Sequence, residues 1–257
     1  MQPLTLSFLQ IDTVWHDPAA NREQISGWLD LLPEDSRLVI LPEMFSTGFT
    51  MAATEVAEPM DGPTVGWMRQ EARARGVVIC GSVVISEGGH SYNRFIWAAP
   101  DRVATYDKRH LFRMAGEHHH YASGTQRLVV QLDGWRICPV ICYDLRFPVW
   151  LRNRDDYDLM LCPANWPATR AQAWDGLLKA RAIENLSYVV GVNIIGVDGN
   201  GVGYSGGSVV YGPEGESLLH AQDGRGVFTV TLSGEDLLAY RKSFPAWQDA
   251  DDFQLTE

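Results

Sequence analysis

Trp-Arg-Ile-Cys-Pro-Val-Ile-Cys-Tyr-Asp-Leu-Arg-Phe-Pro, residues 135–148, is an apolar run that ends abruptly in a polar stretch. The run predicts a buried strand over residues 135–142. Cys138 would share a strand face with Cys142, but Pro139 and more apolar residues follow it, as in a strand that continues. Polar residues follow Cys142, so its thiol is expected at a strand exit where it can meet solvent and substrate. Cys142 is therefore the candidate nucleophile.

Two other strand exits carry the groups that a thiol nucleophile needs. Residues 39–43 (Val-Ile-Leu-Pro-Glu) predict a buried strand that ends at Glu43, and residues 105–110 contain Lys108. Only the thiolate attacks a carbonyl or nitrile carbon well, and a nearby base or cation raises its fraction. We expect Glu43 to take the proton, while Lys108 and the backbone N–H of Tyr143 stabilise the oxyanion.

Each of these side chains also has a structural alternative. Glu43 would cap the next segment, Lys108 would be one of several solvated charges, and Cys142 would be an inert core residue. The other cysteines, Cys80, Cys138 and Cys162, lie in apolar runs without a disulfide framework or paired metal-ligand spacing.

Strand-like and helix-like segments alternate along the chain. Gly88-Gly89 and Asp133-Gly134 mark hairpin turns, and residues 196–207 predict a loop that returns to a strand over 208–211. Helices are predicted over 19–32, 64–74 and 170–186 and after Pro148, with strands over 4–11, 38–41, 77–85, 92–98, 102–106, 128–132 and 135–142. This alternation predicts an α/β fold of mixed sheets with helices on their outer faces.

Six short motifs occur in the order that one known family would require. They are Leu41-Pro42-Glu43-Met44, Tyr106-Asp107-Lys108, residues 141–148, Pro163-Ala164-Asn165-Trp166-Pro167, residues 180–185, and Gly207-Ser208-Val209-Val210 with Gly212-Pro213-Glu214-Gly215. Together they resemble the carbon-nitrogen hydrolase (nitrilase) superfamily. The resemblance implies a four-layer α-β-β-α sandwich whose catalytic residues meet at strand ends on one rim. It also implies a second glutamate near the lysine, which Glu117 matches; a solvated loop acid is the alternative.

Two loop strings narrow the resemblance. Residues 43–49 and 116–121 look most like those of the omega-amidase branch, whose members release ammonia from 2-oxoacid amides such as 2-oxoglutaramate and 2-oxosuccinamate. The expected function is hydrolysis of such an amide to the 2-oxo dicarboxylate through a cysteine thioester. A hydrolase of another small amide, a carbamoyl amino acid or a nitrile is the alternative within the family.

Arg146 lies four positions after Cys142 and is the candidate for binding a substrate carboxylate. The alternative is a structural salt bridge to Asp144 or Glu184. Four further residues are candidate walls of the same pocket, or side chains packed behind it: Phe45, Tyr121, Asn165 and Trp166.

Three consecutive histidines, His118, His119 and His120, suggest a metal site, and a non-catalytic metal-binding scaffold is the alternative from another class of protein. Adjacent side chains point in different directions, however, so three ligands for one ion are not expected. The thiol chemistry itself requires no metal or cofactor.

Composition sets broad limits on partners. With 257 residues, a formal charge of −11 and a pI near 5.0, the chain is not expected to bind nucleic acid or an anionic membrane. Its apolar runs are too short for a bilayer span and no signal segment is evident, so we expect a cytoplasmic protein. We also expect one domain over residues 1–257, with an acidic extension from about 245. The resemblance to the nitrilase superfamily implies a homodimer formed through the outer helix around residues 171–184, and packing of that helix within the protein's own core is the alternative.

Overall fold

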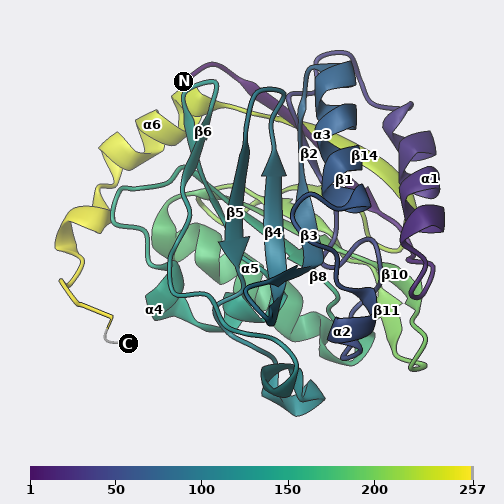
Figure 1. Ribbon diagram of the computed structural model, residues 1–257. Helices are drawn as coiled ribbons and strands as arrows, with labels where there is room; N and C mark the ends of the chain where they lie inside the picture. Colours follow the sequence, from purple (N-terminus) through teal and green to yellow (C-terminus); the bar gives the residue numbers. More distant parts are fainter. Residues whose placement is uncertain (256–257) are drawn as a thin grey trace.

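The computed structural model describes residues 1–255, and most of its strands lie in two six-stranded sheets (Figure 1). The first sheet has the order β14-β1-β2-β3-β4-β5. Strands β1, β2 and β3 are parallel, whereas β14, β4 and β5 are antiparallel to their neighbours. The bounds are β1 Leu4–Gln10, β2 Leu38–Ile40, β3 Val78–Glu87, β4 His90–Ala98, β5 Val103–Asp107 and β14 Gly226–Leu232.

The second sheet repeats this mixed pattern in the order β13-β12-β9-β8-β7-β6. Strands β7, β8 and β9 are parallel and form its centre. The bounds are β6 Val130–Leu132, β7 Trp135–Pro139, β8 Leu159–Ala164, β9 Tyr188–Asn193, β12 Val209–Tyr211 and β13 Ser217–His220. A separate two-stranded sheet pairs β10 (Ile195–Val197) with β11 (Gly203–Ser205).

Alternating side chains divide the core into layers. In β2, Leu38 and Ile40 join a buried cluster that contains residues of both sheets, whereas Val39 joins a second cluster with residues of α1 and α3. The period of two along a strand sends neighbouring side chains to opposite faces, so the sheets pack face to face and the helices lie outside. The predicted α-β-β-α sandwich is therefore confirmed.

The helices cover the outer faces of the sheets. Helices α1 (Pro18–Leu29) and α3 (Pro63–Arg75) pack on the first sheet, and α5 (Ala171–Asn185) packs on the second (Figure 1). Shorter helices are α2 (Ala53–Val56) and α4 (Pro148–Leu151), and α6 (Gly234–Ser243) follows β14. None of the helices within residues 1–255 is both long and apolar enough to span a membrane.

The structure corrects some predicted element boundaries. The strand predicted over 135–142 ends at Pro139, and Cys142–Arg146 form the 3₁₀ helix η3 instead. The loop predicted over 196–207 contains most of the β10–β11 hairpin. The acidic extension predicted from about 245 includes the 3₁₀ turn Ala246–Asp249 and the Phe253 ring, over which Arg154 lies at 4.2 Å. Its last residues, Thr256 and Glu257, lie outside the described residues, and the single-domain boundary of 1–257 stays a prediction.

Candidate active site

Cys142 follows β7 after two residues and begins η3 with a strained backbone conformation. Its φ is +44°, a left-handed value that is unfavourable for a residue with a Cβ. The side chain is 8% exposed and lines a cavity. The N–H of Tyr143, the next residue, has no hydrogen-bond acceptor within residues 1–255, so it is available to an oxyanion.

Asp144 supports this turn with four hydrogen bonds. Its carboxylate is fully buried and accepts from the N–H of Ile141 at 3.0 Å and the hydroxyl of Tyr106 at 2.8 Å. It also accepts from the N–H of His110 at 2.9 Å and contacts the Nδ1 of that histidine at 2.8 Å. Asp144 therefore joins the nucleophile turn to the segment 106–110, which carries Lys108.

Glu43 follows β2 and meets Lys108 inside the protein. The Glu43 side chain is 0% exposed, and its Oε1 accepts from Lys108 Nζ at 2.8 Å. Its Oε2 accepts from the backbone N–H of Asn165, at the exit of β8, at 2.8 Å. The exits of β2, β5 and β8 thus converge, as expected for side chains at the carboxyl ends of strands in an α/β fold.

Glu117 completes the surroundings of Lys108. It lies in the 3₁₀ turn Glu117–His119, is fully buried, and accepts from Lys108 Nζ on both carboxylate oxygens at 3.0 Å. Lys108 is itself 1% exposed, so its ammonium group is held between two carboxylates rather than by water. The structure brings together Glu43, Lys108 and Glu117, and Cys142 interacts electrostatically with Glu43 and Lys108.

The charges in this cluster determine its resting protonation. Burial alone would lower the pKa of Lys108, but the carboxylates of Glu117 and Glu43 outweigh burial and raise that pKa well above its ordinary value. Burial raises the pKa of the Cys142 thiol well above its ordinary value, Glu43 raises it further, and Lys108 opposes the rise. Burial raises the pKa of Glu117, opposed by Lys108. The lysine therefore rests charged and the thiol rests protonated.

The sequence interpretation missed Asn93, which bridges the two carboxylates. Its Nδ2 donates to Glu43 Oε1 at 2.8 Å and to Glu117 Oε1 at 3.3 Å. This neutral donor gives each of the two buried carboxylates a further hydrogen bond, and an unpaired carboxylate would be costly there. Asn93 lies on β4, and Lys108 N–H donates to its backbone carbonyl at 3.0 Å. In the sequence Asn93 is one residue of an ordinary strand and belongs to no motif, so no local signal indicates its role.

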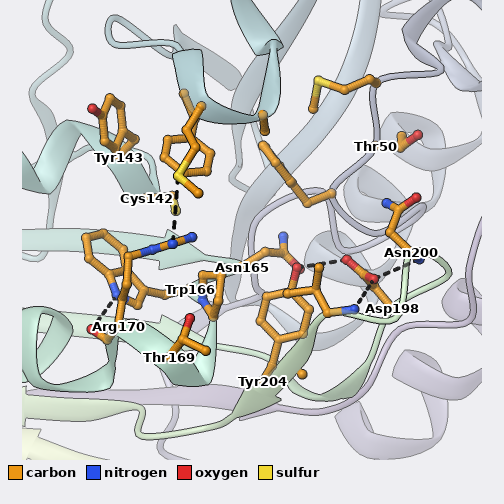
Figure 2. A pocket seen from close by; sticks show the side chains of 18 of the residues that line it. Thr50, Cys142, Tyr143, Asn165, Trp166, Thr169, Arg170, Asp198, Asn200 and Tyr204 are labelled. Atoms are coloured by element: carbon orange, nitrogen blue, oxygen red, sulfur yellow. Dashed lines mark hydrogen bonds between the residues drawn. The ribbon is translucent and has the colours of Figure 1, made fainter.

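Cys142 lines a cavity of about 850 Å³ (Figure 2). Asn165 and Trp166, two of the four candidate walls, line it, and so does Arg146, the candidate ligand of a substrate carboxylate. The guanidinium of Arg146 lies 4.9 Å from the centroid of the Trp166 ring. The alternative salt bridges of Arg146 are wrong, because Asp144 is engaged by the contacts described above and Glu184 pairs with Arg181 at 2.9 Å.

The other two candidate walls, Phe45 and Tyr121, are packed away from the cavity, which is the alternative given for them. Phe45 is 1% exposed and packs among the core residues under α1 and α3, with its ring centroid 6.0 Å from that of Trp67. Tyr121 is 5% exposed and donates from its hydroxyl to the carbonyl of Thr50 at 2.7 Å. Neither lines the cavity; Tyr121 instead supports Thr50, which does.

The three histidines do not form a cluster with other ligand types. The rings of His118 and His119 pack against each other, with centroids 3.8 Å apart. Within residues 1–255 no group of three or more His, Cys, Asp or Glu side chains is arranged to hold a metal ion.

Comparisons with known proteins agree with this geometry. A family model described as "Carbon-nitrogen hydrolase" matches residues 5–242. The chain is 48% identical to the omega-amidase YafV of Yersinia enterocolitica, over 99% of this chain and 100% of that protein. It is 28% identical to the 2-oxoglutaramate amidase of Bacillus subtilis, over 95% and 96% of the two chains. The crystal structure of XC1258 from Xanthomonas campestris, a CN-hydrolase superfamily protein with an arsenic adduct in its active site, superposes with a TM-score of 0.98 at 48% identity, covering 100% of both chains.

Proposed function

The chain belongs to the carbon-nitrogen hydrolase family, and on that premise we propose that it hydrolyses the terminal amide of a small 2-oxoacid amide. The substrates would be 2-oxoglutaramate and 2-oxosuccinamate, and the products ammonia and the 2-oxo dicarboxylate. The observation that carries this proposal is the buried contact cluster of Glu43, Lys108 and Glu117 behind Cys142, below a cavity that contains the unpaired guanidinium of Arg146.

The first half-reaction forms a thioester on Cys142. Glu43 takes the thiol proton as sulfur attacks the amide carbon, and the carbonyl oxygen becomes an oxyanion that Lys108 and the Tyr143 N–H stabilise. The oxyanion collapses, the carbon–nitrogen bond breaks, and the proton on Glu43 passes to the nitrogen so that ammonia leaves. Moving one proton from Cys142 to Glu43 leaves the net charge of the buried cluster unchanged, which avoids the cost of creating a new buried charge.

The second half-reaction releases the acid. Glu43 removes a proton from a water molecule that attacks the thioester carbon, and the same oxyanion donors stabilise the second tetrahedral intermediate. The intermediate collapses, the carbon–sulfur bond breaks, and the Cys142 thiolate leaves and takes the proton from Glu43. Glu117 does not exchange protons in this scheme; it keeps Lys108 charged and oriented through its two 3.0 Å contacts.

Arg146 is the proposed ligand of the substrate carboxylate. Its guanidinium lies over the Trp166 ring, lines the cavity, and forms no ion pair within residues 1–255. A guanidinium without a carboxylate partner in a cavity favours an anionic ligand, and a bidentate pair would also orient the amide toward Cys142.

The proposal is tested by ammonia release from a panel of substrates. We expect 2-oxoglutaramate and 2-oxosuccinamate to be hydrolysed with much higher kcat/KM than glutamine, asparagine, carbamoyl amino acids or simple nitriles. Cys142→Ala should abolish turnover, and mass spectrometry of the quenched wild-type enzyme should detect an acyl adduct at Cys142. Full turnover by Cys142→Ala, or a preference for an uncharged nitrile, would contradict the proposal.

We propose further that the protein is a cytoplasmic homodimer. All four cysteines are free and buried, as suits a reducing compartment. On the outer surface, Val149 of α4 is 52% exposed and Ile183 of α5 is 46% exposed. Light scattering of the purified protein measures its mass, and Ile183→Glu should convert a dimer of this kind to a monomer.

A further inference from the structure

A second arginine, Arg170, lines the same cavity as Cys142 and Arg146. It ends the 3₁₀ turn η4 (Ala168–Arg170), just before α5. Its backbone carbonyl accepts from Trp166 Nε1 at 2.9 Å, so the residue is fixed to the indole that lies under Arg146. Figure 2 shows Arg170 and Trp166 close together on one side of the cavity, with Asp198 and Asn200 on the other.

The guanidinium of Arg170 has only weak partners. Its carbon lies 5.3 Å from the centroid of the Phe112 ring, and its Nη1 is 4.0 Å from the sulfur of Met114. No carboxylate within residues 1–255 lies within ion-pair distance of it, whereas Arg94 and Arg241, which are largely buried, pair with acids at 2.6–2.7 Å. A thioether is a poor acceptor, so the Arg170 guanidinium can exchange this contact for a stronger one at little cost.

The cavity also lacks a free acid. Asp198 is the only Asp or Glu among its lining residues. Its Oδ1 accepts from the N–H groups of Asn200 at 2.8 Å and Val202 at 3.0 Å, and its Oδ2 accepts from the Tyr204 hydroxyl at 2.9 Å. The carboxylate is thus used to hold the β10–β11 hairpin. Two uncompensated guanidinium groups therefore face one cavity, in a chain whose formal charge is −11.

One arginine, Arg146, is enough to bind the substrate carboxylate, so Arg170 is available for the group next to that carboxylate. A 2-oxoacid amide carries a carbonyl oxygen next to its carboxylate, and this oxygen only accepts hydrogen bonds. In the corresponding 2-amino acid an ammonium group stands at the same carbon, and it only donates. A cation placed at that position would bind the first and repel the second, which is discrimination by repulsion as well as by attraction.

We propose that Arg170 binds the 2-oxo group of the substrate and thereby excludes 2-amino acids such as glutamine. This inference rests on the proposed function and on Arg146 as the ligand of the carboxylate. When substrate binds, the Arg170 guanidinium leaves Met114 and donates to the 2-oxo oxygen while it remains near the Phe112 ring. Arg170 is then a specificity-determining residue that takes no part in the proton transfers at Cys142.

Three substrates separate this role from general attraction of anions: 2-oxoglutaramate, glutaramate with a CH₂ group in place of the 2-oxo group, and glutamine. For Arg170→Met, which approximates the length of the side chain without its charge, we expect the ratio of kcat/KM for 2-oxoglutaramate to that for glutaramate to fall at least fivefold. The ratio for 2-oxoglutaramate to glutamine should fall by more, because the repulsion is also lost. The control is Arg113→Met, which removes the same charge from an exposed arginine outside the cavity and should leave both ratios unchanged.

The outcomes are distinguishable. A wild-type enzyme that hydrolyses uncharged pentanamide as well as 2-oxoglutaramate contradicts the proposed function itself. A wild-type preference for 2-oxoglutaramate that changes less than fivefold in Arg170→Met contradicts the role of Arg170 and leaves the proposed function intact. Equal losses in Arg113→Met would assign the effect to long-range attraction and overturn the inference. If circular dichroism shows that Arg170→Met is unfolded, Arg170→Gln replaces it with the same expected ratios.

Discussion

The replacement Asp144→Asn tests whether the nucleophile turn is held by a single carboxylate. Asparagine has almost the same shape as aspartate but only one acceptor oxygen. Asp144 accepts from two backbone N–H groups, one on each oxygen: Ile141 on Oδ2 and His110 on Oδ1. The other two partners can adapt, because the Tyr106 hydroxyl can rotate and the His110 ring can change tautomer. Whichever way the amide turns, one buried backbone N–H loses its acceptor.

The size of the effect follows from this count. One buried unsatisfied N–H costs about 1–3 kcal/mol, and loss of the negative charge weakens the remaining bonds by about 1 kcal/mol. The expected loss of unfolding free energy is therefore about 2–4 kcal/mol, or roughly 4–16 °C in Tm for a chain of this size. Because Cys142 is held at a φ of +44°, its turn should also relax. A displacement of about 1 Å at the nucleophile can cost about 100-fold, so kcat should fall about 10- to 100-fold while KM changes little.

Two measurements check this prediction. Thermal unfolding followed by circular dichroism gives the change in stability, and initial rates of ammonia release from 2-oxoglutaramate give kcat and KM. Asp107→Asn is the matched control, because Asp107 also pairs with a neighbouring strand, through Arg94, but at the partly exposed edge of the sheet. Its effect on kcat should be below threefold. Wild-type kcat in folded Asp144→Asn would refute the idea that this carboxylate positions Cys142.

Three further changes have defined outcomes. The Glu43 carboxylate raises the pKa of Cys142, so Glu43→Gln should shift the pH profile of Cys142 alkylation by iodoacetamide toward lower pH. The same change should abolish turnover. A shift toward higher pH would mean that Glu43 does not raise the pKa of the thiol. In Glu117→Gln an NH₂ group faces a donor, either Lys108 Nζ or the Phe112 N–H, in place of a carboxylate oxygen. The kcat for ammonia release should therefore fall at least about 100-fold with little change in KM. A change in KM alone would argue that Glu117 binds substrate. Gly191→Ala places a Cβ against the buried side chain of Leu178, and calorimetry should show a loss of about 1–3 kcal/mol; an unchanged Tm would mean that α5 can shift.

Two of the strands that carry the site, β2 and β8, were predictable because their side chains are buried on both faces. Leu38–Ile40 and Leu159–Ala164 are continuous apolar runs that stop at polar residues, and such stops mark strand exits. The later strand Ser217–His220 and the helix Gly234–Ser243 were not predicted, since they are partly exposed and their apolar residues are sparse. The β10–β11 hairpin is hidden in a Gly-rich segment, where backbone hydrogen bonds rather than side chains define the pairing.

Within the site, sequence predicted the reacting groups better than their supports. Cys142 and Glu43 stand at strand exits that local pattern reveals. Phe45 follows Glu43 by only two residues, yet the turn at Met44, with φ +42°, separates their directions, and Phe45 enters the core instead of the cavity. Asn93 acts through contacts with residues 24 and 50 positions away in sequence, so its role appears only after folding.

The burial of the cluster also explains how an enzyme can keep a cysteine nucleophile protonated and still use it. Glu43, Lys108 and Glu117 are at most 1% exposed, whereas the Cys142 side chain reaches the cavity. Burial holds the resting Cys142 thiol neutral, and the weakly screened charge of Glu43 raises the pKa of that thiol further; the same carboxylate is the proposed acceptor of its proton. Once the proton has moved, the same location leaves Lys108 facing a thiolate beside a neutral acid. The proton transfer therefore converts an inert thiol into an ion-paired nucleophile. Before a substrate arrives the thiol stays protonated, which limits its side reactions.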